Sequence, residues 1–194
     1  MFMQKKLLQI YNELLKQFGP QHWWPADSAY EVVVGAILTQ NTNWKNVEKV
    51  INSLKKENKL NEKAILEITI SELENLIRSS GFYKQKAERL KLATKKWFEL
   101  KDKNDLSIDV LRKELLSVKG IGKETADSII LYAFEKPIFV IDAYTRRFCK
   151  KYFNFESKNY DEYRTFFEDN LSQDLELFKE YHALIVEWAK NTKS

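Results

Sequence analysis

Amphipathic helical periodicity recurs along almost the whole of this 194-residue chain and restricts its fold more than any other feature. Apolar residues return at the i, i+3, i+4 spacing that places them on one face of a helix. The first such run, Leu7 to Phe18, ends at Gly19-Pro20. The short apolar run Ile138 to Ile141 could form a strand, but a single strand has no partner here. We therefore predict an all-α fold of about ten helices.

Residues that cap helices mark where several of these segments begin. Asp27 or Ser28 can cap the helix that carries the apolar run Tyr30 to Leu38. Thr42 is placed to open the next helix, and Thr69 has the form of a cap for a later one. No stretch rich in Gly, Pro or Ser separates these helices, so any division into lobes must come from packing.

Composition restricts the class of protein. With 44% hydrophobic residues, the chain can bury a core as one domain or as two lobes. No run approaches the roughly 18 apolar residues of a membrane span. We therefore expect no membrane association and a cytoplasmic, nucleoid-associated or otherwise intracellular protein. The one cysteine, Cys149, excludes internal disulfides and four-cysteine sites built from this chain alone, and we expect it to be a small buried residue.

Positive charge is clustered rather than evenly spread. A net charge of +4 favours polyanionic partners only mildly. Two basic clusters stand out, one of Lys84, Lys86, Arg89, Lys91, Lys95 and Lys96, and one of Arg146, Arg147, Lys150 and Lys151. Each is typical of a DNA-binding surface and also of an ordinary solvated helix face.

The most informative segment runs from Leu115 to Ile130. Its core, Gly120-Ile-Gly122, lies between two apolar-periodic helices, so the glycines can reverse the chain with backbone angles that other residues resist. The N–H groups of such a turn and of the next helix's first turn can bind a phosphate oxygen without reading a base. Lys119, Lys123 and Thr125 beside the turn favour this interpretation over a plain helical corner.

Four blocks, in order along the chain, resemble the endonuclease III superfamily of helix-hairpin-helix DNA glycosylases. The hairpin is followed twenty residues after Gly122 by Asp142, in Val140-Ile-Asp-Ala-Tyr-Thr-Arg-Arg-Phe148, which is similar to the family's aspartate segment. Val34-Gly-Ala-Ile-Leu-Thr-Gln-Asn-Thr42 resembles the helix and loop that enter the DNA, and Ser80-Gly-Phe-Tyr-Lys-Gln-Lys-Ala87 resembles another family turn.

The resemblance implies a two-lobed helical fold with the active cleft between the lobes. We expect one lobe over 29–136, with the hairpin at 115–130, and a second over 1–28 plus 137–194 that carries Asp142 as the catalytic residue. Gln40, Asn41 and Thr42 are expected to contact DNA together with the hairpin residues Lys119, Gly120, Gly122, Lys123 and Thr125.

Two departures from the family pattern narrow the activity. Bifunctional members carry a catalytic lysine one residue before the Thr-Ala pair, where this chain has Glu124, so Schiff-base chemistry loses its amine. Lys123 is a poor substitute because one position turns a helical side chain by about 100°. Cluster-bearing relatives continue into four spaced cysteines, which do not follow Lys190 here. We therefore expect no iron–sulfur cluster, no cofactor and no metal.

In both departures the chain resembles one branch of the superfamily, the monofunctional 3-methyladenine glycosylases that are similar to endonuclease III. Sequence around His22-Trp-Trp-Pro-Ala-Asp27 and Gln40-Asn-Thr-Asn-Trp44 is similar to that branch, which implies that Trp23, Trp24 and Trp44 line the base pocket. Lys190 is a further pocket residue by the same resemblance. Aromatic rings bind a cationic alkylated purine by stacking and cation–π attraction, and a carboxylate can stabilise the developing oxocarbenium ion.

The predicted activity is therefore hydrolysis of the N-glycosidic bond of alkylated purines in damaged double-stranded DNA, by a monomer, after base flipping. A bifunctional glycosylase/lyase, a mismatch glycosylase and a non-catalytic helix-hairpin-helix DNA-binding protein are the alternatives.

Simpler roles stay open for individual residues. Asp142 can be the N-cap of the following helix, a role that is compatible with catalysis. Gln40 and Asn41 can mark a plain helix exit, and Lys190 can be a solvated lysine. His22 and His182 are expected to be hydrogen-bonded structural histidines, because nothing near them has metal-ligand spacing.

Overall fold

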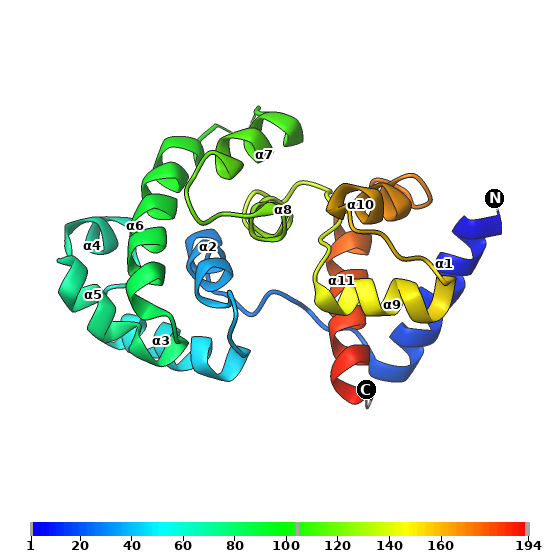
Figure 1. Ribbon diagram of the computed structural model, residues 1–194, viewed down its shortest axis with the longest axis horizontal. Coiled ribbons are helices and arrows are strands. Elements are labelled where there is room, and N and C mark those ends of the chain that lie inside the picture. The colour runs from blue at the N-terminus through cyan, green and yellow to red at the C-terminus, as the bar shows by residue number, and fades with distance from the viewer. Residues whose placement is uncertain (1, 104, 193–194) are drawn as a thin grey trace. The chain divides into compact units, whose positions relative to one another are not determined.

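The computed structural model describes residues 2–103 and 105–192 and is entirely helical over those ranges (Figure 1). The helices are α1 (Phe2–Phe18), α2 (Ala29–Leu38), α3 (Trp44–Lys56), α4 (Glu62–Glu67), α5 (Ile70–Leu76), the 3-10 helix η1 (Arg78–Ser80), α6 (Tyr83–Leu100), α7 (Ile108–Leu116), α8 (Lys123–Tyr132), α9 (Ala143–Phe153), α10 (Tyr160–Glu168) and α11 (Leu175–Asn191). The described residues contain no strand, which confirms the all-α prediction and the interpretation of Ile138–Ile141.

The helix boundaries follow local chemistry. Helix α1 ends at Phe18 before Gly19, which has a φ of 71° that favours glycine. Ser28, rather than Asp27, caps α2, and Thr69 forms a capping box with Glu72. The prediction that Thr42 opens the next helix was wrong by one residue.

Asn43 is the N-cap of α3, and its side chain accepts a hydrogen bond from the Asn46 backbone N–H. Asparagine and threonine both cap well, so sequence alone could not choose between the neighbours.

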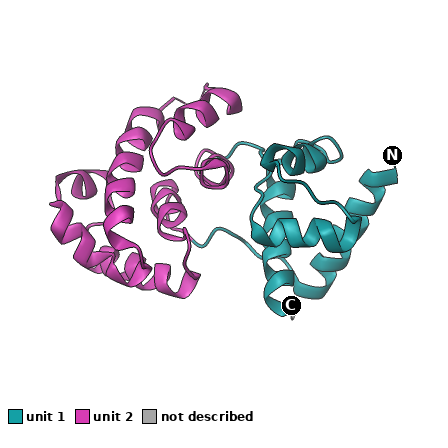
Figure 2. Cartoon of the chain, in the orientation of Figure 1, with its two compact units in different colours: residues 1–25, 135–194 teal, residues 26–134 magenta. Residues whose placement is uncertain are grey.

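The chain divides into two compact units, residues 26–134 and residues 1–25 with 135–194 (Figure 2). From the sequence, the corresponding boundaries are expected at 28/29 and 136/137. Each unit has its own core.

In the unit of residues 26–134, α2 is buried along nearly its whole length and packs against α3, α6 and α8. A helix that is apolar on all sides belongs in the centre of a unit. The exception is Glu31, which is 4% exposed and forms an ion pair with Lys55 at 2.8 Å. The central position of α2 fixes the loop that follows it, residues 39–43.

In the unit of residues 1–25 and 135–194, α11 packs against α1 and α9 around an aromatic core. The rings of Phe139 and Phe167 stack with centroids 3.9 Å apart, and Phe148 packs edge-on against Tyr181 and Trp188. Tyr181 also donates a hydrogen bond to the Leu7 carbonyl at 2.9 Å. Cys149 is fully buried in this core, as expected.

Candidate active site and DNA-binding hairpin

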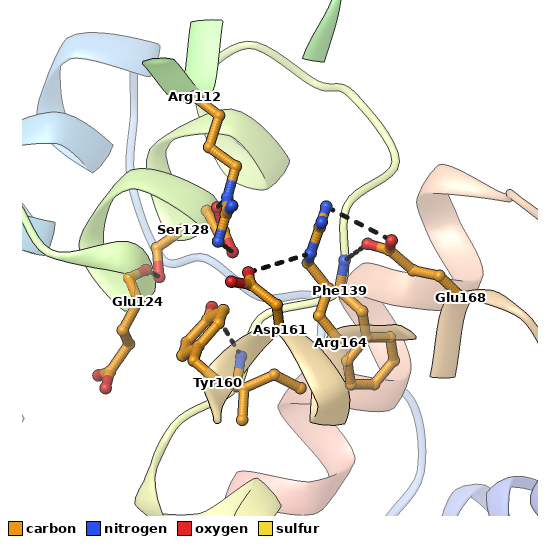
Figure 3. Close-up of polar contacts among 10 residues, drawn as sticks. Arg112, Glu124, Ser128, Phe139, Tyr160, Asp161, Arg164 and Glu168 are labelled. Atoms are coloured by element: carbon orange, nitrogen blue, oxygen red, sulfur yellow. Dashed lines mark hydrogen bonds and ion pairs between the residues drawn. The ribbon is translucent and has the colours of Figure 1, made fainter. Parts of the chain in front are cut away.

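Asp142 is positioned by an extended segment that is buried without being part of a sheet. Residues 138–141 are all at most 1% exposed. Side chains of α10 accept hydrogen bonds from their N–H groups: Phe139 N donates to Glu168 at 2.9 Å, and Ile141 N donates to the Tyr160 hydroxyl at 3.2 Å (Figure 3). Buried backbone groups need such partners. These contacts replace the hydrogen bonds of a neighbouring strand. They explain how an apolar, strand-like segment can be buried without a sheet and place Asp142 at the start of α9.

The two carboxylate oxygens of Asp142 have different neighbours. Oδ1 caps α9 by accepting hydrogen bonds from Thr145 N at 2.7 Å and Thr145 Oγ1 at 2.9 Å. Oδ2 lies 3.6 Å from Nε2 of His182 on α11. Burial raises the pKa of Asp142, but the His182 imidazole and the Thr145 donors outweigh it and hold the pKa below its usual value. Asp142 is therefore an anion at neutral pH.

Two tryptophans extend the site from His182. The rings of Trp23 and Trp24 stack with centroids 5.3 Å apart and planes 19° apart, and Trp23 lies 5.6 Å from the His182 ring at 35°. Both tryptophans are half-buried and lie outside any helix. Trp24, Trp23, His182 and Asp142 thus form a continuous row that ends in a carboxylate, hereafter the Trp–His–Asp row.

Lys190 lies outside the Trp–His–Asp row. It is exposed near the end of α11, where its ammonium is 3.4 Å from Glu187. It follows His182 by eight residues on the same helix, a rise of about 12 Å. The structure therefore does not bring Lys190 to Asp142.

The hairpin between α7 and α8 turns on one glycine rather than two. Gly120 has a φ of 91°, and the N–H of Ile121 donates to the Val118 carbonyl at 3.1 Å, which closes the turn. Gly122 has an ordinary φ of −92° and open space around its α-carbon. The prediction of unusual backbone angles is confirmed for Gly120 and was wrong for Gly122, where the chain has already become extended.

Helix α8 begins at this hairpin without a side-chain cap, since Gly122 stands at the N-cap position. Eight other helices, α2 to α5, α7 and α9 to α11, have a capping side chain. The N–H groups in the first turn of a helix can donate hydrogen bonds to an anion. Lys119 is exposed beside them, and Lys123 is the half-buried first residue of α8. This end of α8 is therefore suited to a phosphate.

The loop after α2 is fastened to the hairpin by Gln40. Its Nε2 donates to the Gly120 carbonyl and to Thr125 Oγ1, both at 3.0 Å, and its Oε1 accepts from Arg89 Nη1 at 2.8 Å. The sequence suggested that Gln40 contacts DNA, but in this structure its amide holds the hairpin. Asn41 next to it is exposed, with a φ of 53°.

Thr42 and Trp44 complete the residues predicted from this loop. Thr42 N donates to the Thr39 carbonyl at 3.1 Å, and Thr42 is half-buried. Trp44 is the half-buried first residue of α3, in the unit that carries the hairpin, whereas Trp23 and Trp24 belong to the other unit.

A buried ion pair joins the two helices of the hairpin, α7 and α8. Asp127 on α8 is fully buried, and its carboxylate accepts hydrogen bonds from Arg112 on α7 at 2.7 and 3.4 Å. Sequence reasoning missed this pair, as it missed the contacts of Arg89 and His182. None of the three has a motif, and each joins residues that only folding brings together.

Within residues 2–103 and 105–192, none of the helices combines the length and the apolar character that a membrane span requires. No group of three or more His, Cys, Asp or Glu side chains there is arranged to hold a metal ion.

Comparison with known proteins connects this geometry to one family. The model of the HhH-GPD superfamily base excision DNA repair proteins matches residues 34–173. A Methanocaldococcus jannaschii protein, provisionally named as a DNA repair glycosylase, is 53% identical over 191 residues, which cover 95% of this chain and 87% of the relative. These matches confirm the resemblance found in the sequence.

Solved structures show the same similarity. The H. pylori 3-methyladenine DNA glycosylase MagIII, bound to 1,N6-ethenoadenine, matches with a TM-score of 0.79 and 33% identity over 98% of this chain and 97% of that chain. An endonuclease III in a trapped covalent intermediate with DNA matches with a TM-score of 0.78 and 20% identity, over 98% and 89% of the two chains. At that identity the second likeness concerns the fold alone.

Proposed function

Because this chain belongs to the HhH-GPD superfamily of base excision DNA repair proteins and is a DNA glycosylase of that superfamily, we propose that it is a monofunctional enzyme that releases alkylated purines such as 3-methyladenine. The observation that carries the proposal is the Trp–His–Asp row, in which an ionised carboxylate ends a row of aromatic rings. The similarity to MagIII, at 33% identity over nearly the whole of both chains, supports the same substrate class.

The row suits a positively charged base. An alkylated purine carries positive charge, and indole faces attract cations as well as stack on planar rings. In this proposal the flipped base lies against Trp23 and Trp24, and the pocket roles of Trp44 and Lys190 stay predictions from the sequence. The base must leave the duplex first, because the pocket cannot reach into stacked DNA.

Asp142 supplies the chemistry in this proposal. As the glycosidic bond breaks, positive charge develops on the sugar, and a preformed anion stabilises it without having to reorganise. The same carboxylate can orient the water that attacks the sugar. The depressed pKa of Asp142 keeps the group ionised, as this role requires.

The hairpin supplies the sequence-independent grip on DNA. Phosphate contacts position a protein on the duplex and carry no sequence information. We assign the phosphate contacts to the hairpin residues Lys119, Gly120, Gly122, Lys123 and Thr125. In the same proposal, Asn41 and Thr42 fill the gap that the flipped base leaves in the duplex. Gln40 supports the hairpin from the same loop.

The monofunctional part of the proposal rests on Glu124. This exposed residue in the first turn of α8 stands where the lyase lysine of the family would stand. A carboxylate cannot form a Schiff base. The proposal also includes a monomer that acts on damaged double-stranded DNA inside the cell, and no iron–sulfur cluster, because the chain contains a single cysteine.

The test is base release from methylated duplex DNA, with strand breaks measured with and without alkali. Breaks that need alkali support a monofunctional alkyl-base glycosylase. Breaks without alkali indicate a bifunctional enzyme. No release from methylated DNA, but release from mismatched or oxidised duplexes, indicates another lesion, and no release from any of them indicates a non-catalytic binder.

The variant Asp142→Asn separates catalysis from binding. We expect it to lose base release by about 100-fold or more, the effect of removing a group that stabilises transition-state charge. Binding to a duplex with an abasic-site analogue should change little. Equal loss of release and binding would contradict the catalytic assignment.

A further inference from the structure

His182 is a buried histidine with two defined neighbours. Its exposed fraction is 3%, and it lies on the side of α11 that faces α9 and the Trp23-Trp24 segment. The sequence suggested an ordinary structural histidine. The contacts indicate something more specific, because one neighbour is the proposed catalytic carboxylate and the other is a proposed wall of the base pocket.

The carboxylate of Asp142 is oriented from two sides. Thr145, from the same helix, fixes Oδ1 through two hydrogen bonds. A carboxylate held at one oxygen can still rotate and tilt about its Cβ–Cγ bond. His182 faces the other oxygen from α11, with Nε2 3.6 Å away. The two contacts together define the plane of the carboxylate.

The imidazole is itself held in place by Trp23. The two rings lie 5.6 Å apart at 35°, and Trp23 stacks in turn on Trp24. A base that stacked against these indoles would therefore be linked to Asp142 through His182. The row joins recognition of the base to placement of the catalytic group.

From this geometry we infer that His182 is a positioning residue for the proposed glycosylase reaction: it orients the Asp142 carboxylate and links it to the Trp23 and Trp24 rings. The inference rests on the proposed function, because it assumes that Asp142 is the catalytic group.

Burial raises the pKa of Asp142, and the His182 imidazole on α11 together with the Thr145 donors on α9 lowers it. On α9 itself, Arg146 lies over the ring of Tyr163 at 4.8 Å. Burial raises the pKa of Cys149 to about 12, so the thiol is neutral at physiological pH. Removing His182 should therefore raise the pKa of Asp142.

The experiment compares the wild type with His182→Phe and His182→Gln. Phenylalanine keeps a ring against Trp23 but has no nitrogen to face Asp142, whereas glutamine loses the ring and can place an amide N–H near the carboxylate. Single-turnover release from methylated duplex is measured across pH. Titration of Asp142 is followed by NMR of carboxyl-labelled aspartate, with Asp142→Asn identifying the signal. Thermal melting checks that both variants fold.

For His182→Phe we expect a loss of about 10- to 100-fold in the single-turnover rate at neutral pH, because misplacing a catalytic group by about 1 Å can cost about 100-fold. The acid limb of its pH profile and the NMR midpoint of Asp142 should both move to higher pH. His182→Gln should recover part of the rate. Binding to the abasic-site analogue should stay within about twofold, since in the proposal the phosphates are bound by the hairpin.

The outcomes separate the two proposals. A folded His182→Phe with a wild-type rate, or with an unchanged Asp142 midpoint, overturns the role of His182 even if the wild type releases methylated bases. A shifted midpoint in an enzyme that releases no base would instead refute the proposed function and leave the coupling of His182 to Asp142 standing.

Discussion

Gly120 is the position in the hairpin at which we expect substitution by alanine to lower stability most. Its φ of 91° is one that residues with a Cβ rarely adopt. A Cβ built there would also lie 2.5 to 2.6 Å from Cγ, Cδ and Nε of Arg89. Gly120→Ala must therefore strain the turn and displace the Arg89 side chain.

Both effects contribute to the expected loss of stability. A left-handed backbone angle at alanine costs roughly 1–2 kcal/mol. Displacing Arg89 breaks its 2.8 Å hydrogen bond to Gln40, and a hydrogen bond to a charged group contributes about 1.5–3 kcal/mol. We expect Gly120→Ala to lower the free energy of unfolding by about 2.5–5 kcal/mol. For a chain of this length, each kcal/mol lowers the melting temperature by about 2–4 °C.

The matched control is Gly122→Ala, two residues further along the same turn. Gly122 has an ordinary backbone angle and no atom within 4 Å of a built Cβ. Alanine there loses only the small advantage of glycine at an N-cap, about 1 kcal/mol or less. Thermal and urea unfolding of both variants measure the difference.

Binding of undamaged duplex at fixed salt then tests the proposed phosphate contacts of the hairpin. We expect Gly120→Ala to bind more weakly than Gly122→Ala, because only the first displaces the turn that presents the α8 amides. If the two variants lose equal stability, or if Gly120→Ala melts within about 2 °C of the wild type, the close approach of Arg89 is not what requires glycine.

Two further predictions concern charged side chains. Glu124→Lys should gain a borohydride-trappable complex with an abasic duplex, whereas the wild type and the surface control Glu48→Lys should not; trapping by the wild type would contradict the monofunctional assignment. Lys86 donates hydrogen bonds to the Leu38 and Ser80 carbonyls at 2.8 and 2.6 Å, and burial lowers its pKa to about 8. Between about pH 8 and the unfolded lysine value near 10.4 the unfolded chain binds more protons, so the unfolding free energy of the wild type relative to Lys86→Met should rise with pH across that window. Urea unfolding of both proteins from pH 7 to pH 10 measures this, and a falling difference would contradict it.

The helices could be predicted from the sequence because their ends depend on residues that are close together in the chain. The helix end at Gly19 and the N-cap at Thr69 depend on residues a few positions apart, and both occur as expected. The error at Thr42 arose because two adjacent residues, Thr42 and Asn43, are both good caps. Gly122 was misjudged because a Gly-apolar-Gly pattern does not say which glycine makes the turn.

The candidate site could be predicted only in part, because some of its contacts join residues that are far apart in the sequence. Asp142 and the tryptophans came from motifs that stay together in the chain. The apolar residues around His182 predict only a buried position in the core. Its partner Asp142 is 40 residues away in the sequence. The link between Gln40 and Arg89 likewise depends on how α2 and α6 pack. Pairs of this kind are set by tertiary packing, which a periodic pattern does not encode.

Asp142 is the N-cap of α9 as well as the proposed catalytic residue, and the two roles can be separated by one substitution. As N-cap of α9 it accepts two hydrogen bonds from Thr145 through a single oxygen. Asparagine caps a helix about as well as aspartate and offers the same acceptor, so Asp142→Asn should retain α9. The variant loses the charge near the helix N-terminus, which contributes about 0.3–1 kcal/mol at an exposed helix end and up to about 2 kcal/mol where the group is partly buried. It also loses the charge that faces His182 Nε2 at 3.6 Å. A large loss of base release in a variant that melts close to the wild type would therefore come from the missing anion rather than from a damaged fold.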